Sequence, residues 1–354
     1  MIAWDTAAKV AKGLISTFPK EDKVALERMS DSLSDFGSQA LDLVENVSGL
    51  TLLDKTISVR CTTRSEWVDS NVLSMASLMD PMLNKFAPKL PGGLSTISAN
   101  AGAVQFGLLF GWMSKRVLGQ YDAALFANVN PDENTTVPIY MVGSNILDLE
   151  AKFGFPRAQF ERWVLLHELT HKVQFESVSW MNSYYRSLIS SLIDGVNLGP
   201  SDLFGAIVRV AEDIRVGRNP LAEAGLAGIF VSEEQRKSLS KIGGLMSVLE
   251  GHADFVMARA ARGIIEEADH FEEVLHDRRE SPNFVSKIVS QLYGLDAKVK
   301  QYAAGRSFLE AIDDAAGRDG IKTLFMASEN MPTLDEISRP DRWMERVLTP
   351  LVKS

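Results

Sequence analysis

Two histidines four residues apart lie in the stretch LLHELTHKVQFE, residues 165–176. Residues at this spacing leave the same face of an α-helix about one turn apart, so the imidazoles of His167 and His171 could bind one zinc ion together. Glu168 directly follows the first histidine, which is the position of the general base in zinc hydrolases. The spacing therefore predicts two zinc ligands, and a base that activates a zinc-bound water for hydrolysis.

The surroundings of this pattern favour a metal site over a chance match. A motif with three fixed positions also arises in unrelated proteins. The chain has five histidines, however, and two of them fall here beside the apolar residues 163–166, where a buried imidazole pair needs partners. Catalytic zinc usually has three protein ligands, but Gln174 and Ser177 stand where one extended form of the motif has its glycine and third histidine. We therefore expect the third ligand from another segment.

The best candidate for that ligand lies in LMSVLEGHADFVMARAA, residues 245–261, an apolar run with embedded charges. In a helix Glu250 and Asp254 share a face, whereas His252 points nearly the opposite way. We predict Glu250 as the third ligand and Asp254 as the acceptor that holds the far nitrogen of a ligating histidine. The alternative is a core helix in which both acids pair with basic side chains and His252 is an interior histidine.

Hydrolysis of a carbonyl compound forms an oxyanion, and active sites for it usually include a hydrogen-bond donor that stabilises this charge. The sequence offers weaker candidates for this donor. His252 and Tyr302 could serve, although a tyrosine in an apolar helix is more often part of the core. Gln174 lies seven residues after His167 and shares the ligand face. It either borders the cleft or bonds a neighbouring backbone group.

The segments that must position these residues are predominantly helical. Apolar residues recur at helical spacing in the N-terminal part and again after residue 145, and a helix is expected to begin near Pro156. Residues 56–62 and 137–142 are short strand candidates, while residues 87–102 are rich in Pro, Gly and Ser and predict a loop. We therefore expect an α+β fold dominated by helix, with a little sheet just before the motif helix.

Length and composition predict one large globular unit. The chain has 354 residues, of which 45% are hydrophobic and 23% charged, an ordinary balance for a protein with a large core. We expect a single unit over residues 1–354, with an N-terminal helical part (1–95) and a part that bears the metal site (96–354). The lone Cys61 excludes an intrachain disulfide.

Charge and hydropathy restrict the partners. The net charge is -9 and no basic cluster occurs, which argues against nucleic acid and anionic membrane as partners and favours a peptide or small-molecule substrate. The first residues lack the apolar core of a signal peptide, and the apolar run 101–113 is too short to span a bilayer. We expect a cytoplasmic protein; its oligomeric state stays open.

Several long stretches of the chain resemble a known family. HELTHKVQFESVSW, MSVLEGHADFVM and YGLDAKVKQYAAGRSF are similar to the DUF2342 family, whose members are described as zinc-dependent metalloproteases or hydrolases and sometimes as coenzyme F420 biosynthesis-associated. The resemblance extends upstream through WVDSNVLSMASLMDPMLNKF and KRVLGQYD and downstream to MPTLDEISRPDRWMERV, so it covers nearly the whole chain. It implies a zincin-like metalloprotease fold, with a small sheet beside the helix of the His-Glu-x-x-His motif.

The resemblance also implies roles for the candidate residues. The segment from Glu250 to Asp254 is similar to the Glu-x-x-x-Asp element of gluzincins, whose Glu binds zinc and whose Asp orients a histidine. This implies ligand roles for His167, His171 and Glu250, a base role for Glu168 and an orienting role for Asp254. The leading hypothesis is a zinc-dependent peptidase. A zinc hydrolase of a nonpeptide small molecule and a noncatalytic, zinc-stabilised scaffold are the alternatives.

Overall fold

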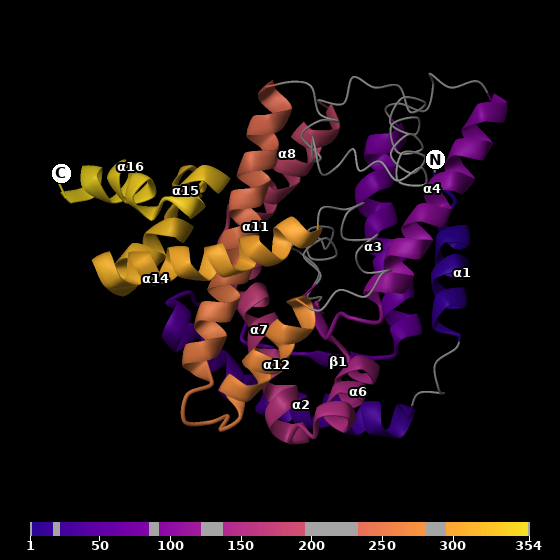
Figure 1. Cartoon of the computed structure of the whole chain (residues 1–354), viewed down its shortest axis with the longest axis horizontal. Coiled ribbons are helices and arrows are strands. Elements are labelled where there is room, and N and C mark those ends of the chain that lie inside the picture. The colour runs from indigo at the N-terminus through magenta and orange to yellow at the C-terminus, as the bar shows by residue number, and fades with distance from the viewer. Residues whose placement is uncertain are drawn as a thin grey trace.

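The structure is a computed structural model that describes residues 2–16, 22–84, 92–121, 137–194, 233–280 and 295–352. Within these ranges helices surround a small three-stranded sheet (Figure 1). The expected α+β fold, dominated by helix with a little sheet, is confirmed.

The sheet has the order β1-β3-β2. Strand β3 (Ile139–Val142) is the central strand. It pairs in parallel with β1 (Val59–Thr62) and antiparallel with β2 (Gly119–Tyr121). Val59 lies opposite Ile139, and Gly119 lies opposite Met141. The predicted strands at 56–62 and 137–142 are confirmed with shorter limits, whereas β2 was not predicted.

Three long helices build the core beside this sheet. They are α2 (Lys23–Ser48), α7 (Arg157–Ser177) and α11 (Glu233–Ala260). Helix α7 packs against α2, α11 and β2 and is buried on most of its circumference, because apolar side chains follow one another along it. It begins directly after Pro156, as the sequence predicted, since the fixed φ of proline suits a helix start.

The N-terminal helices form one side of the molecule. Helix α1 (Trp4–Ile15) packs along α4 (Gly92–Met113), and α3 (Arg64–Asn84) adjoins both (Figure 1). The loop expected at residues 87–102 is helical from Gly92 onward, and further along this helix Gly107 and Gly111 pack closely against α1. The expected division at residues 95 and 96 therefore falls inside α4; residues 85–91 lie outside the described ranges.

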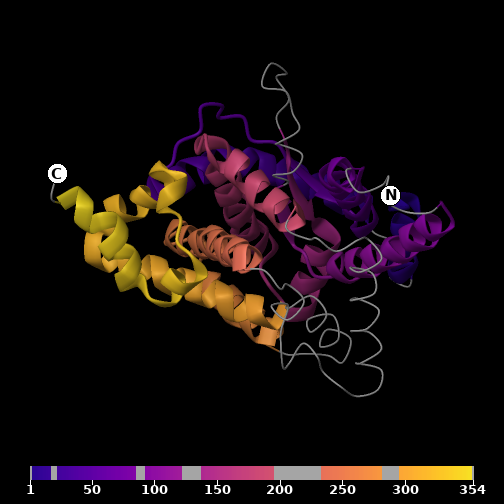
Figure 2. The ribbon, with the colours of Figure 1, turned by 90° about the horizontal axis from the view of Figure 1, so that it is seen from above.

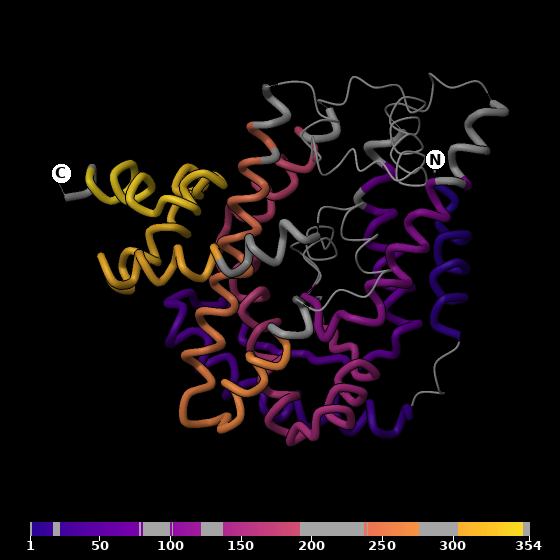
Figure 3. Tube along the Cα trace, in the orientation of Figure 1, coloured from indigo at the N-terminus to yellow at the C-terminus, as the bar shows by residue number. Residues whose placement is uncertain are grey.

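The remaining helices cover the core and form the C-terminal side. They are α6 (Gly143–Phe153), α8 (Met181–Asp194), α12 (Ala268–Glu280), α14 (Leu295–Met326), the 3-10 turn η3 (Ser328–Asn330), α15 (Leu334–Ser338) and α16 (Pro340–Val352). Helix α11 lies between α14 on one side and α7 and α8 on the other (Figure 2). The first and last helices, α1 and α16, lie at opposite ends of the molecule (Figures 1 and 3).

No helix in the described ranges is both long enough and apolar enough to cross a membrane.

Candidate metal centre

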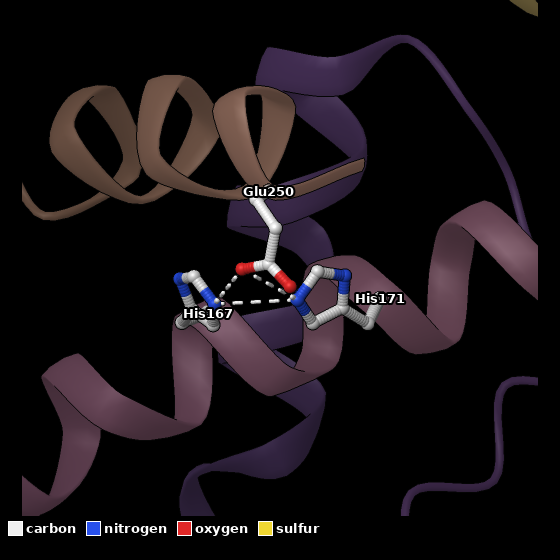
Figure 4. A group of neighbouring side chains, drawn as sticks. All are labelled: His167, His171 and Glu250. Atoms are coloured by element: carbon white, nitrogen blue, oxygen red, sulfur yellow. Dashed lines mark hydrogen bonds and ion pairs between the residues drawn. The ribbon is translucent and has the colours of Figure 1, made fainter. Parts of the chain in front are cut away.

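Helices α7 and α11 bring the predicted metal ligands together. His167 and His171 leave α7 on the side that faces α11, and Glu250 reaches down from α11 between them (Figure 4). The three side chains form a group whose donor atoms all lie within 4.8 Å of one another. The two segments, far apart in the sequence, therefore meet at one point.

The distances between these donor atoms suit a tetrahedral zinc ion. The Nε2 atoms of His167 and His171 are 3.2 Å apart. Oε2 of Glu250 lies 3.6 Å from Nε2 of His167 and 3.9 Å from Nε2 of His171. Ligand atoms at about 2.0–2.1 Å from a tetrahedral zinc are themselves about 3.3 Å apart. The donor set and its spacing therefore fit the ion with small adjustments of Glu250.

The site is partly open to solvent. The side chains of His167 and His171 are 18% and 15% exposed, and that of Glu250 is 24% exposed. Among the described residues the group has three members, which is the number of protein ligands in catalytic zinc sites, where the fourth position takes water or substrate. A structural zinc site is normally closed by a fourth protein ligand instead.

Asp254 lies behind the first histidine. Its Oδ1 is 3.4 Å from Nδ1 of His167, the nitrogen that faces away from Glu250. Burial opposes protonation of His167, but the hydrogen bonds with Asp254 and Glu250 outweigh it and raise the pKa of His167 to about 10. A group of side chains that attracts a proton this strongly provides a favourable field for a metal cation.

Glu168 is held beside the ligands by strand β2. It is only 7% exposed, and its Oε2 accepts a hydrogen bond of 3.2 Å from the backbone N–H of Tyr121. A side chain at Gly119 would place its Cβ 2.4 Å from Cγ of Glu168, so only glycine allows the carboxylate to pack against the strand. Burial raises the pKa of Glu168, while the nearby histidines lower it. Such a carboxylate is a suitable proton acceptor.

Residues 2–344 match the Zincin-like metallopeptidase family. This chain belongs to that family. Its fold is also similar to the crystal structure of a Chloroflexus aurantiacus protein described provisionally as a hydrolase with a novel fold, at 24% sequence identity and a TM-score of 0.72, covering 99% of both chains. No curated protein matches the chain significantly.

In this zincin-like metallopeptidase a close helix crossing lies beside the predicted third ligand, Glu250. Gly251, next to Glu250, lies against α14: a Cβ at Gly251 would be 2.4 Å from the carbonyl carbon of Gly305. A Cβ at Gly305 would in turn lie 2.0 Å from the carbonyl oxygen of Ser247. The two backbones touch here because neither glycine has a side chain.

Gln174 and His252, two candidates for a residue that borders the cleft or stabilises the oxyanion, lie in the protein interior. Gln174 and His252 are fully buried. The His252 ring packs against Phe325 at 4.8 Å between centroids, and burial, followed by the charge of His171, lowers the pKa of His252 to about 3. Neither side chain faces solvent, where a substrate would arrive. The Tyr302 side chain lies outside the described residues, although its backbone belongs to α14.

Two contributors to this zincin-like site escaped the sequence reasoning, namely Gly119 and the backbone N–H of Tyr121. Strand β2 has three residues, too few to show an alternating pattern. The glycine was the one available signal, because a glycine in a strand often marks the close approach of another group.

Proposed function

We propose that this zincin-like metallopeptidase is a zinc-dependent hydrolase that cleaves peptide bonds. The observation that carries the proposal is the convergence of His167, His171 and Glu250 around one point, with Glu168 held beside it. When bound, zinc lowers the pKa of a coordinated water and polarises a substrate carbonyl. The chain's own residues supply the ligands and move the proton.

Glu168 is the general base in this proposal. Its buried carboxylate takes a proton from the attacking water and later passes it to the leaving amine. Because the Tyr121 N–H occupies Oε2, the carboxylate is held in one orientation and its other oxygen is left to accept the proton. Asp254 orients Nδ1 of His167, so that Nε2 is the nitrogen turned toward the ion.

The family supports a peptide substrate, and the donor set supports hydrolysis. A noncatalytic scaffold is less well supported, because it has no need of Glu168 and would favour a closed site. A nonpeptide amide would undergo the same chemistry, and substrate profiling separates these possibilities.

The test combines metal analysis with a peptide-library cleavage assay on the purified chain. We expect the wild type to bind about one zinc ion and to cleave peptides. Glu168→Gln should keep the zinc but lose cleavage by about 10²-fold or more, because the base is gone while its shape is retained. Glu161→Gln, which changes another buried acid of α7, serves as the matched control with activity close to wild type.

Two results would count against the proposal. Cleavage by Glu168→Gln at the wild-type rate would remove its role as base. Zinc binding without cleavage of any library peptide would favour a nonpeptide substrate.

A further inference from the structure

We propose that Gln174 is a positioning residue that fixes His171 for zinc binding and ties it to the helix that carries Glu250. The inference rests on the proposed zinc site and deepens it. Gln174 lies one turn after His171 on α7, and its carboxamide is fully buried between α7 and α11. It therefore belongs to the packed layer behind the ligands and not to the substrate side.

The carboxamide of Gln174 makes three hydrogen-bond contacts. Its Oε1 lies 2.9 Å from Nδ1 of His171. Its Nε2 donates to the carbonyl oxygen of Leu249 at 3.0 Å and lies 2.9 Å from Nδ1 of His252. One side chain thus connects a metal ligand on α7 with the backbone group next to Glu250 on α11.

The Leu249 carbonyl determines the orientation of this amide. A backbone carbonyl can only accept a hydrogen bond, so the amide nitrogen of Gln174 must face it and Oε1 must face His171. An amide turned the other way would bring two oxygens together at Leu249. The donor and acceptor chemistry of the two groups therefore fixes the orientation of the amide.

The orientation of the amide in turn determines the tautomer of His171. Because Oε1 of Gln174 is an acceptor, Nδ1 of His171 must carry a proton. In the neutral ring Nε2 of His171 is then the nitrogen with the lone pair, and it is the atom that faces Glu250 and the other histidine. The Gln174 contact thus favours the tautomer and the ring orientation in which Nε2 can bind zinc.

His252 completes the arrangement on α11. The second amide hydrogen of Gln174 points to Nδ1 of His252, so this nitrogen accepts and the proton lies on Nε2. Nε2 of His252 is buried and has no hydrogen-bond partner in the part of the chain that the structure describes. An unsatisfied buried donor costs stability. The hydrogen bond that His252 accepts from the Gln174 amide offsets part of this cost.

The two histidine ligands therefore have partners of different charge. Asp254, an acid, lies behind His167, whereas the neutral Gln174 lies behind His171. The centre already contains the carboxylates of Glu250 and Glu168. An amide orients the second ring without adding another negative charge beside them.

The test is the zinc dissociation constant of the purified full chain, measured by competition with a chromophoric chelator. Gln174→Met keeps the length of the side chain but removes its hydrogen bonds, and we expect it to weaken zinc binding by about 10–100-fold. Thr170→Val is the matched control: Thr170 is also fully buried on α7, but within the described ranges its hydroxyl bonds only the Leu166 carbonyl. Its dissociation constant should stay close to wild type.

A second measurement separates positioning from a general structural role. In the zinc-loaded wild type, NMR should detect a slowly exchanging Nδ1 proton on His171, and in Gln174→Met that proton should exchange rapidly. If Gln174→Met fails to fold, Gln174→Asn provides the same test, since its shorter amide cannot reach both His171 and Leu249.

The possible failures are distinguishable. Zinc binding by Gln174→Met at wild-type affinity, with the Nδ1 proton still protected, overturns the role of Gln174 and leaves the proposed function standing. A wild-type chain that binds no zinc overturns both.

Discussion

Helix α7 carries a buried carboxylate at two places, and the two differ in what surrounds them. Glu168 lies among His167, His171 and Glu250, whose donor atoms converge. Glu161, about two turns earlier, lies near Glu150 of α6. The carboxylate oxygens of Glu150 are buried without a hydrogen-bond partner among the described residues.

The difference shows which neighbours allow a buried acid to take part in a metal site. At the acid pair Glu150 and Glu161, burial and then the second carboxylate raise the pKa of Glu150 to about 8, so a proton is the cation that neutralises it. In the described ranges no third metal-binding side chain lies close enough to complete a site there. At Glu250 two imidazole nitrogens provide the missing donors. Burial of acids alone therefore gives protonation, and converging nitrogen donors give a site for a metal.

The largest expected effect is the stabilisation of the folded chain by zinc, which tests the proposed metal site at Glu250. Zinc at about 10⁴ times its dissociation constant should raise the free energy of unfolding by about 5.5 kcal/mol, because the ion binds only the folded chain. Glu250→Ala should lose most of this gain, whereas Glu161→Gln at the acid pair should keep it. Denaturant unfolding with zinc or with a chelator measures all three. Equal stabilisation of Glu250→Ala and wild type would contradict the assignment of the third ligand.

The second prediction tests the acid pair. The folded pKa of Glu150 is about 8, against 4.5 when exposed, so the folded state holds an extra proton between these values and wild-type stability falls as pH rises through this window. Glu150→Gln removes that loss. We expect the variant to gain roughly 4 kcal/mol over wild type at pH 9 relative to pH 5, because about three pH units of the window lie between these values and each corresponds to about 1.4 kcal/mol.

Unfolding curves at the two pH values measure this gain. Glu27→Gln, at an exposed position of α2, is the control and should show no such pH-dependent difference. A Glu150→Gln variant whose advantage is the same at pH 5 and pH 9 would show that the carboxyl is not held neutral by burial.

The smallest effect concerns Arg157, a cation beside Glu150 of the acid pair. Nε of Arg157 lies 3.6 Å from Glu150, but the arginine side chain is 73% exposed, so solvent screens the pair. Arg157→Gln should destabilise the chain by less than about 1 kcal/mol at pH 9 and should have no effect through this pair at pH 5, where Glu150 is protonated. A larger loss at pH 9 would mean that arginine, and not the proton, neutralises Glu150.

Local helix geometry made much of the centre predictable from the sequence. The spacing of His167 and His171, and of Glu250 and Asp254, depends only on the helical repeat, and the structure places each pair on one face. The strands β1 and β3 were also predicted, β1 from a short alternating run and β3 from a short apolar run that ends at Gly143.

The contacts between elements were not predictable in the same way. For Gln174 the sequence left two roles open, and the structure places it on the Leu249 backbone, because the approach of α11 to α7 creates that partner. Strand β2 is too short to give a pattern of its own, and its place beside Glu168 depends on pairing with β3. Such features follow from packing between segments far apart in the chain, which residue spacing does not encode.

The glycine crossing between α11 and α14 determines which mutations the catalytic centre can tolerate. Gly305 contributes no metal ligand, yet any side chain there would push α14 away from Ser247 and move the turn that carries Glu250. Inherited changes that inactivate the protein should therefore appear on α14 as well as on the ligand helices. The proposed centre thus has a vulnerable position more than fifty residues after Glu250, on a helix that carries none of its proposed ligands.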